Sequence, residues 1–369
     1  MSTIFLHVGT PKTGTSAIQF FCSKNRKVLK SKGFCYPDLG FRFPGIGVNR
    51  NGHFMNRKVL DENKKRMPEE EEKIVAQGME KIQKLLEKFP NIILSDEQFW
   101  NNKDLTTEKW IKYKEMFTQM GADVKVIVYL RRQDLLIQSY WAQQVKETMT
   151  MSFKKYIESG KYKYFNVDYY KRLEEIAKAV GKENIIVRVY EKQQYYGGSI
   201  TSDFLHVLGL ELTDEFKSPD NVVNASLEGS CLEVKRLLNN NEIYKNKKNF
   251  MVPLLTQVQE EMVGHVGYDK GKYFSKEEQL AFMELYKEGN ATVAKQYMGR
   301  QDGVLFQDEV VTADGGEKAT QYSSKELVLI LGEVIAKQQQ IIEEKDQELE
   351  ELKKPVKGVV QIAKKVFRK

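Results

Sequence analysis

Short apolar runs alternate with amphipathic stretches along most of the chain. The apolar runs are continuous, which is typical of strands buried on both faces of a sheet; they cover residues 3–8, 91–97, 124–130 and 184–190. Apolar positions at helical spacing fill the stretches between and after them, at residues 14–32, 69–88, 202–209 and 276–298. Strands alternating with helices predict an α/β fold of three layers, α/β/α, around a central parallel sheet.

A long stretch without periodicity, residues 33–68, interrupts this alternation. It is rich in Gly and Asn and includes the run NRNGHF, which carries His53. Loops of this length inside a domain are usually functional.

The last sixty residues follow a different pattern. Residues 307–326 lose periodicity and predict a linker. Residues 327–354 predict a helix of weak coiled-coil character, which could pair two copies as a homodimer; a solvated charged helix is the alternative. Its seam would use Leu327, Leu331, Val334, Ile341 and Leu352, with Gln338, Lys345 and Glu348 interrupting it.

Pro355 ends that helix and begins a basic amphipathic tail, residues 355–369. Its apolar side chains fall on one helical face, with Lys and Arg opposite. The pattern suits peripheral contact with an anionic membrane and equally suits a partner-binding helix.

The net charge of +7 over 369 residues belongs to this end of the chain. Residues 353–369 hold seven Lys and Arg and no acid, so the rest of the chain is near neutral (7 − 7 = 0). No nucleic-acid partner is therefore expected. With 41% apolar residues the chain can bury a substantial core.

Cysteine usage and hydropathy point to a location. Cys22, Cys35 and Cys231 have no metal-ligand spacing and leave one unpaired, which suits free thiols in a reducing compartment. No leader sequence is visible, and no apolar run approaches the roughly 20 residues that span a bilayer. We expect a soluble, cytoplasmic protein, with peripheral contact at the inner face of the membrane as the role of the tail.

The run HVGTPKTGTSAIQ follows the first predicted strand directly and opens the first helix. A glycine-rich turn from strand to helix presents unpaired backbone N–H groups and a helix dipole, which together bind anions. The candidate anion-binding residues are Pro11, Lys12, Thr13, Gly14, Thr15 and Ser16. Gly14 lets the backbone approach closely, the hydroxyls can donate, and Lys12 supplies positive charge.

The order of these residues excludes an ordinary nucleoside-triphosphate loop. A Walker loop places Lys after its last Gly, whereas Lys12 precedes Gly14 and no GxxxxGK occurs. PKTGTS instead resembles the 5′-phosphosulfate loop of sulfotransferases, P-K-[ST]-G-[ST]-[ST], at every position.

A second segment adds to this resemblance. The run VKVIVYL ends at Arg131, and Ser139 follows eight residues later, inside the next predicted helix. In sulfotransferases a similar Arg and Ser hold the 3′-phosphate of the donor 3′-phosphoadenosine 5′-phosphosulfate (PAPS), a role that a guanidinium and a hydroxyl fit chemically. Arg132, whose spacing to Ser139 is one residue shorter, could bind the phosphate in place of Arg131. Alternatively, the arginine has a structural role and forms a surface ion pair with Asp134 or Glu147.

The resemblance extends over roughly residues 1–306, through YLRRQDLLIQSYWAQQVK, NIIVRVYEKQQYYGGSITSDFLHVLGL, NASLEG and EGNATVAKQYMGR. These segments resemble the bacterial carbohydrate sulfotransferase-like domain. The resemblance implies the sulfotransferase fold and transfer of a sulfuryl group from PAPS, in line and without a metal, to a hydroxyl or amine of a glycan or glycolipid. The C-terminal helix and tail lie outside it and resemble appendages of enzymes of surface-polysaccharide biosynthesis.

Two residues are candidates for the base that the acceptor hydroxyl needs. Glu97 follows the run NIILSD, in a setting where members of the family carry an acid; an incidental solvent-facing Glu is the alternative. His53 lies in the long loop, where its near-neutral pKa would suit a base, or it is an incidental polar residue. Lys12 would neutralise charge on the leaving phosphate oxygen, and Trp100, Trp110 and Trp141 could stack on a sugar or fill the core.

Two other functions remain open from the sequence. One is a P-loop kinase-like phosphotransferase, which would need Mg²⁺ and ATP. The other is a non-catalytic scaffold that binds membrane through its tail. The four histidines form no metal-ligand cluster, so no metal site is predicted.

Overall fold

The computed structural model describes residues 2–217, 226–245, 247–263, 273–308 and 323–353. The chain forms two compact units. Unit 1 contains residues 1–140, 157–223 and 275–317, and unit 2 contains residues 141–156, 224–274 and 318–369. Residues 141–156 and 224–274 thus belong to the same unit as the C-terminal helix. The sequence predicted a single domain over residues 1–306, and this domain boundary stays a prediction.

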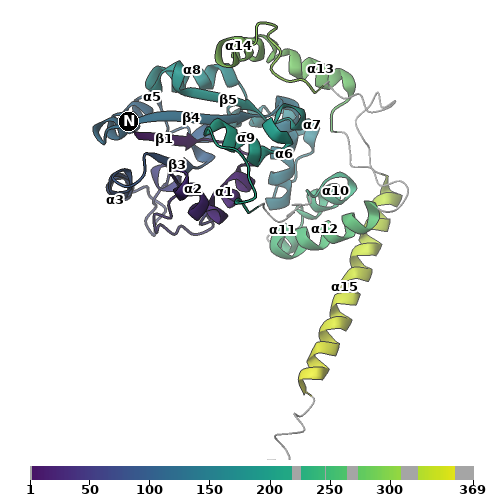
Figure 1. Ribbon diagram of the computed structural model, residues 1–369. Coiled ribbons are helices and arrows are strands. Elements are labelled where there is room, and N and C mark those ends of the chain that lie inside the picture. Colours follow the sequence, from purple (N-terminus) through teal and green to yellow (C-terminus); the bar gives the residue numbers. More distant parts are fainter. Residues whose placement is uncertain (1, 218–225, 246, 264–272, 309–322, 354–369) are drawn as a thin grey trace, which may run out of the picture. The chain divides into compact units, whose positions relative to one another are not determined.

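Unit 1 is built around a parallel five-stranded sheet of order β2-β3-β1-β4-β5 (Figure 1). Its strands are β1 (Ser2–His7), β2 (Phe34–Cys35), β3 (Asn91–Ser95), β4 (Ala122–Leu130) and β5 (Ile185–Val189). The order reverses direction at β1, which lies between β3 and β4. The loops after β1 and β4 therefore leave the sheet at a switch point, where open parallel sheets bind ligands.

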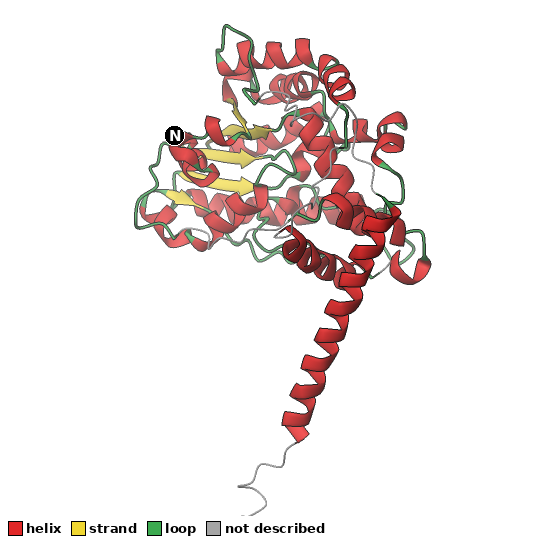
Figure 2. Ribbon diagram, turned by 90° about the vertical axis from the view of Figure 1, so that its right-hand side faces the viewer, coloured by secondary structure: helices red, strands yellow, loops and turns green. Residues whose placement is uncertain are grey.

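Helices cover both faces of this sheet, so the predicted α/β/α layering is confirmed (Figures 1 and 2). On one face, α1 (Thr15–Lys24), α2 (Arg26–Ser31) and α9 (Ile200–Val207) share a core with β1, β3 and β4. On the other, α5 (Thr107–Gln119) and α8 (Tyr169–Val180) pack on each other and on β4. The strands are buried on both sides, which explains their continuous apolar runs.

The remaining helices of unit 1 connect these layers. They are α3 (Pro68–Leu86), α4 (Gln98–Asn101), the first part of α6 (Gln133–Glu147), α13 (Lys276–Glu284) and α14 (Lys287–Met298). Short 3₁₀ turns occur at His53–Met55, Lys161–Phe165, Lys182–Asn184, Lys192–Gln194 and Tyr196–Gly198.

Three local predictions differ from the structure. Residues 14–32 form two helices, because the Asn25 side chain donates to Phe21 O and Lys217 O, both at 2.9 Å, and so competes with the helical backbone. Residues 276–298 also form two helices, α13 and α14. The two-residue strand β2 lies inside the stretch expected to be irregular, and it is too short to leave a periodic signal.

Aromatic and thiol side chains mostly fill cores. The side chains of the three tryptophans, Trp100, Trp110 and Trp141, are each at most 2% exposed. They fill the core, and the other role that the sequence left open, stacking on a sugar, does not fit this burial. The three cysteines are free and buried, as predicted.

Unit 2 is helical in the part that the structure describes. It holds the end of α6, α7 (Phe153–Glu158) up to residue 156, α10 (Gly229–Leu238), α11 (Glu242–Lys245), α12 (Lys248–Val263) and α15 (Ser324–Lys353). α10, α12 and α15 pack on one another.

The predicted C-terminal helix is present as α15, and coiled-coil pairing remains a prediction. Of the seam positions expected from sequence, Val334 is buried within the unit, whereas Leu331 and Leu352 are exposed. The basic tail, 355–369, and most of the predicted linker lie outside the described residues. Across the described helices, none has the length and apolar character that crossing a membrane requires.

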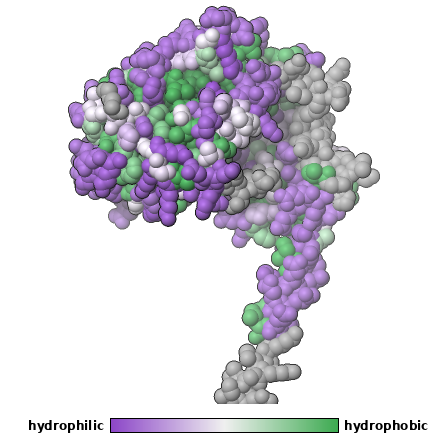
Figure 3. Space-filling model, viewed as in Figure 1, coloured by the Kyte–Doolittle hydropathy of each residue, from purple (hydrophilic) through white to green (hydrophobic). Residues whose placement is uncertain are grey.

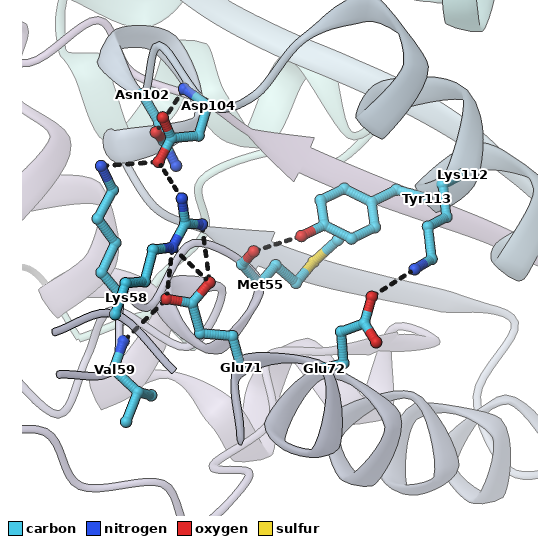
Figure 4. A network of polar contacts seen from close by, with 10 residues as sticks. Met55, Lys58, Val59, Glu71, Glu72, Asn102, Asp104, Lys112 and Tyr113 are labelled. Carbon is cyan, nitrogen blue, oxygen red and sulfur yellow. Dashed lines mark hydrogen bonds and ion pairs between the residues drawn. The ribbon is translucent and has the colours of Figure 1, made fainter. Parts of the chain in front are cut away.

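Polar contacts brace the long loop between β2 and α3 at its far end (Figure 4). Glu71 of α3 accepts from the Arg66 guanidinium at 2.8 Å and from the backbone N–H of Val59 at 3.0 Å. Arg66 also pairs with Asp104 at 3.0 Å, and the Tyr113 hydroxyl of α5 donates to Met55 O. The segment after His53 is thereby held against α3 and α5.

We expect Glu71→Ala to lower the free energy of unfolding by about 2 kcal/mol. The substitution removes the carboxylate that accepts hydrogen bonds from the Val59 N–H and from the Arg66 guanidinium. Burial works to raise the Glu71 pKa, but the hydrogen bonds from Arg66 and Val59 outweigh it and hold the pKa below its ordinary value. The contribution is therefore present at neutral pH and is lost as the pH falls below about 4.5 through the lowered pKa.

Urea denaturation at two pH values measures this effect. Glu72→Ala is the matched control, since Glu72 is 72% exposed and pairs only with Lys112 at 3.2 Å, which predicts a loss under about 1 kcal/mol. Equal losses in the two variants would contradict the assigned role of Glu71.

Candidate active site

The loop after β1 is fixed by backbone hydrogen bonds to β4. Thr10 N–H donates to Tyr129 O at 2.9 Å, and Tyr129 N–H donates to Gly9 O at 2.7 Å. α1 then begins at Thr15 with Gly14 as its N-cap, and no side chain caps it. The first N–H groups of α1 are thus left without a side-chain acceptor at the switch point of the sheet, an arrangement suited to an anion.

Backbone conformation at this turn depends on residue type. Gly14 has φ 71°, and a Cβ placed there would lie 2.6 Å from Ile200 Cδ1 and 3.1 Å from Tyr190 Cε2. Lys12 also adopts a left-handed conformation, φ 67°, which costs a residue with a Cβ about 1–2 kcal/mol. Such strain in a non-glycine residue is concentrated at functional sites.

The hydroxyls of the loop are not all available to a ligand. Those of Thr13 and Thr15 both donate to Thr10 O, the latter at 3.1 Å, so they brace the loop from within. Both side chains are buried, whereas Ser16 is exposed. The Thr13 and Thr15 hydroxyls are therefore engaged within the loop, whereas the Ser16 side chain is open to solvent.

Arg131 follows β4 and reaches this loop. Its Nη1 donates to Lys12 O at 3.1 Å, and its guanidinium lies over the Tyr190 ring at 5.6 Å. Arg132 instead pairs with Asp134 in a buried bidentate contact at 2.8 and 3.0 Å. Arg132 thus forms the ion pair with Asp134 that the sequence allowed for Arg131. Arg131 instead contacts the loop after β1.

Ser139 lies on α6, is half-buried, and makes no hydrogen bond to the described residues through its hydroxyl. Within the described part of the chain, no hydrogen bond joins Ser139 to Arg131 or to the opening loop. Its pairing with Arg131 in one phosphate site stays a prediction.

Three charged residues and one histidine gather where β3 ends. Asp96 accepts from His53 Nδ1 at 2.7 Å and from the Arg50 guanidinium, and its side chain is fully buried. Arg50 Nη1 lies 3.6 Å from Glu97 Oε1. Arg50 therefore joins the buried Asp96–His53 pair to a second carboxylate, Glu97, that is 27% exposed.

Asn51 holds this cluster in place on the sheet. Its amide donates to Ile93 O at 2.9 Å and accepts from the backbone N–H of Ser95 at 2.8 Å. These hydrogen bonds attach the long loop to β3, next to Arg50 and His53 of the same loop. Asp96 N–H also donates to His7 O at 3.1 Å, which ties the end of β3 to the end of β1.

Glu97 and Lys12 influence each other electrostatically. Burial raises the pKa of Glu97, and Asp96 adds to this while Arg50 and Lys12 oppose it. Burial lowers the pKa of Lys12, with Arg131 adding to the effect and Glu97 opposing it. A carboxyl with a raised pKa beside a lysine at an anion loop is the combination expected of an acid–base site.

The two predicted bases differ in access. His53 is 6% exposed, and its Nε2 is buried with no hydrogen-bond partner among the described residues. Glu97 is 27% exposed, and the charge of Lys12 acts to lower its pKa. The Asp96 pKa is lowered because the hydrogen bond from His53 and the charge of Arg50 outweigh the effect of burial. His53 with Asp96 therefore forms the inner part of the cluster and Glu97 the outer part.

Sequence analysis missed Arg50 and Asp96. Asp96 had a signal, because it is an acidic residue at the polar end of the predicted strand 91–97, next to Glu97. Arg50 had none beyond lying in the same loop as His53. Among the described residues, no group of three His, Cys, Asp or Glu side chains could hold a metal ion.

Comparisons with known proteins add little beyond the fold. No family model matches the chain. An uncharacterized protein from Archaeoglobus fulgidus is 28% identical over 222 residues, 60% of this chain, and the match spans only 57% of that protein's length. A sulfotransferase from Alicyclobacillus acidocaldarius is similar in structure at 14% identity, covering 64% of this chain and 95% of that one, with a TM-score of 0.35. A likeness this loose carries no argument for function.

Proposed function

We propose that the protein is a sulfotransferase that moves a sulfuryl group from PAPS to a hydroxyl of a glycan or glycolipid. One observation carries the proposal: the Arg131 guanidinium reaches the Lys12 carbonyl in the loop that leads to the uncapped N-terminus of α1, and the Lys12 ammonium interacts electrostatically with Glu97. Two cations and a helix terminus suit a donor with two anionic groups, and a carboxylate beside them suits removal of a hydroxyl proton.

The chain's residues fit such a donor. Because no side chain caps α1, its first backbone N–H groups are assigned to the 5′-phosphosulfate, and Lys12 belongs to the loop that leads to them. Arg131, held at the Lys12 carbonyl, is assigned to the 3′-phosphate, with Ser139 as its predicted companion. The donor supplies the sulfuryl group, and these residues supply its orientation and charge balance.

Proton transfer is assigned to Glu97. Its carboxylate accepts the hydroxyl proton while the acceptor oxygen forms its bond to sulfur and the bond from sulfur to the donor phosphate oxygen breaks. Lys12 stabilises the negative charge that develops on that phosphate oxygen. Arg50 positions Glu97, and the Asp96–His53 pair positions Arg50.

A polar acceptor is what the sequence resemblance implies. A small cavity of about 20 Å³ has Arg50, Phe41, Phe43 and Phe54 among its lining residues. Phe43 also meets the His53 ring edge-on at 5.3 Å. A cavity of this volume has room for about one water molecule, so a sugar ring does not fit inside it.

Calorimetric titration with adenosine 3′,5′-bisphosphate, without added metal, tests the proposal. We expect micromolar binding by the wild type, about −8 kcal/mol, and loss of at least about 2 kcal/mol in Arg131→Ala, because a charged hydrogen bond to phosphate is removed. Arg42→Ala, which removes an exposed arginine paired with Asp38, is the control and should bind as the wild type does.

No binding by a folded wild type would overturn the proposal. ATP with Mg²⁺ is titrated in parallel; a preference for it over the bisphosphate would favour a kinase instead. Binding that Arg131→Ala leaves unchanged would place the 3′-phosphate elsewhere.

A further inference from the structure

α15 carries two apolar faces, and unit 2 covers one of them. Ile330 is fully buried and Val334 is 8% exposed in the helix that packs on α10 and α12. The second face is exposed although it is equally apolar, and Figure 3 shows green side chains on the largely purple surface of this helix. Its members are Val328 (65% exposed), Leu331 (39%), Ile335 (68%), Ile342 (48%), Leu349 (51%) and Leu352 (83%).

The exposed face repeats every seven residues. Val328, Ile335, Ile342 and Leu349 are each seven apart, which makes them a positions of a heptad. Leu331 and Leu352 then fall at d, and Gln338 and Lys345 fill the two d positions between them. A strict seven-residue repeat on an α-helix implies a left-handed supercoil with another helix of the same period.

This seam differs from the one that sequence predicted, and packing decides between them. The sequence seam included Val334, which α10 and α12 cover within unit 2. Among the described residues of α15, the face centred on Ile335 and Ile342 remains open to another molecule, and Leu329, 58% exposed, lies outside its repeat.

The charges beside this face disfavour a lipid surface. An interfacial helix carries Lys and Arg next to its apolar face, whereas Glu343, Glu344, Asp346, Glu348, Glu350 and Glu351 dominate this part of α15. An anionic membrane would repel them.

We propose that α15 pairs with α15 of a second copy of this chain as a parallel, in-register, two-stranded coiled coil. β-branched residues fill three of its four a positions, which favours two strands. In this register Lys345 at d packs beside Asp346 at e of the other copy, so charges of opposite sign meet at the polar layer. Within its own helix Lys345 also pairs with Glu348 at 2.8 Å.

The interface is large enough for a stable pair. α15 has 30 residues, so it is about 45 Å long. Its six exposed apolar side chains would each bury on the order of 100 Å², and with flanking residues such as Ile341 the sum approaches the roughly 800 Å² per partner of a standard interface. Gln338 and Lys345 lower the stability of the pair but restrict its register.

The molar mass of the full chain in solution tests this pairing. Sedimentation equilibrium over a dilution series should give twice 42.8 kDa for the wild type. Ile335→Lys combined with Ile342→Lys should give the single-chain mass. The matched control, Gln340→Lys with Gln347→Lys, adds the same charge on the opposite, outward face and should stay dimeric.

A crosslink tests orientation and covers the case in which the lysine variant misfolds. Ile342→Cys should form a disulfide between copies on oxidation, because equivalent a positions face each other only in a parallel, in-register pair. Gln340→Cys should not, and the three native cysteines are buried. A single-chain mass for the wild type, a mass above two chains, or no crosslink at Ile342→Cys would each overturn the proposal.

Discussion

Lys12→Ala should reduce sulfuryl transfer by about 10³-fold in kcat, about 4 kcal/mol of transition-state stabilisation. Lys12 lies in the opening loop, within electrostatic reach of both Glu97 and Arg131, and its backbone conformation is left-handed. Its ammonium is thus partly withdrawn from water, where a charge interacts more strongly with a developing negative charge. The loss should appear mainly in kcat, because the charge that Lys12 meets grows as the phosphate leaves.

The assay measures release of adenosine 3′,5′-bisphosphate from PAPS in the presence of simple glycosides and 4-nitrophenol as probe acceptors. Lys24→Ala, at the other end of α1, removes the same charge away from the loop and should keep wild-type rates. Lys12→Arg should recover part of the rate, since the charge returns on a different geometry. A Lys12→Ala enzyme as fast as the wild type would refute the role given to this residue.

Glu97→Gln should reduce transfer to an alcohol by about 10²- to 10⁴-fold, the range of general-base catalysis. Glutamine keeps the size and the hydrogen-bonding shape of Glu97 and removes only its basicity. Transfer to 4-nitrophenol should fall much less, because this phenol ionises readily and needs little help from a base. The ratio of the two losses therefore separates proton removal from misplacement of the acceptor.

The pH profile gives a second measure of the same role. Burial raises the Glu97 pKa above its ordinary value of 4.5, and the carboxylate acts as a base only when deprotonated. The rate for alcohols should fall as the pH drops through that raised pKa, and the acid limb should vanish in Glu97→Gln. The opposite result is that His53→Gln abolishes the fall in rate at acid pH while Glu97→Gln keeps it. In that case His53 is the base, and Glu97 has the positioning role.

Local signals in the chain were sufficient for the layers and for the opening loop. Strands of a parallel sheet that is covered on both faces are mostly apolar, so β1, β3, β4 and β5 were all visible as largely apolar runs. The turn from β1 to α1 needs glycine at a left-handed position, and Gly14 occupies it at φ 71°. These features depend on neighbours in sequence, which is why they could be predicted without coordinates.

Features that depend on distant partners could not be predicted in this way. Arg50 and Asp96 meet across 46 residues, and Asn25 breaks a helix because Lys217 lies beside it. The choice between Arg131 and Arg132 also needed the structure, since either could have paired with Asp134, and the buried position of Arg132 decided it.

For α15, the sequence by itself determined a helix with apolar residues on more than one face. Which face stays open was decided only by tertiary packing, because α10 and α12 cover Ile330 and Val334 and leave Ile335 and Ile342 exposed. The same holds for the candidate site: residue types and spacing predicted its anion loop, while the cluster beside it exists only because the long loop and the ends of β1 and β3 meet.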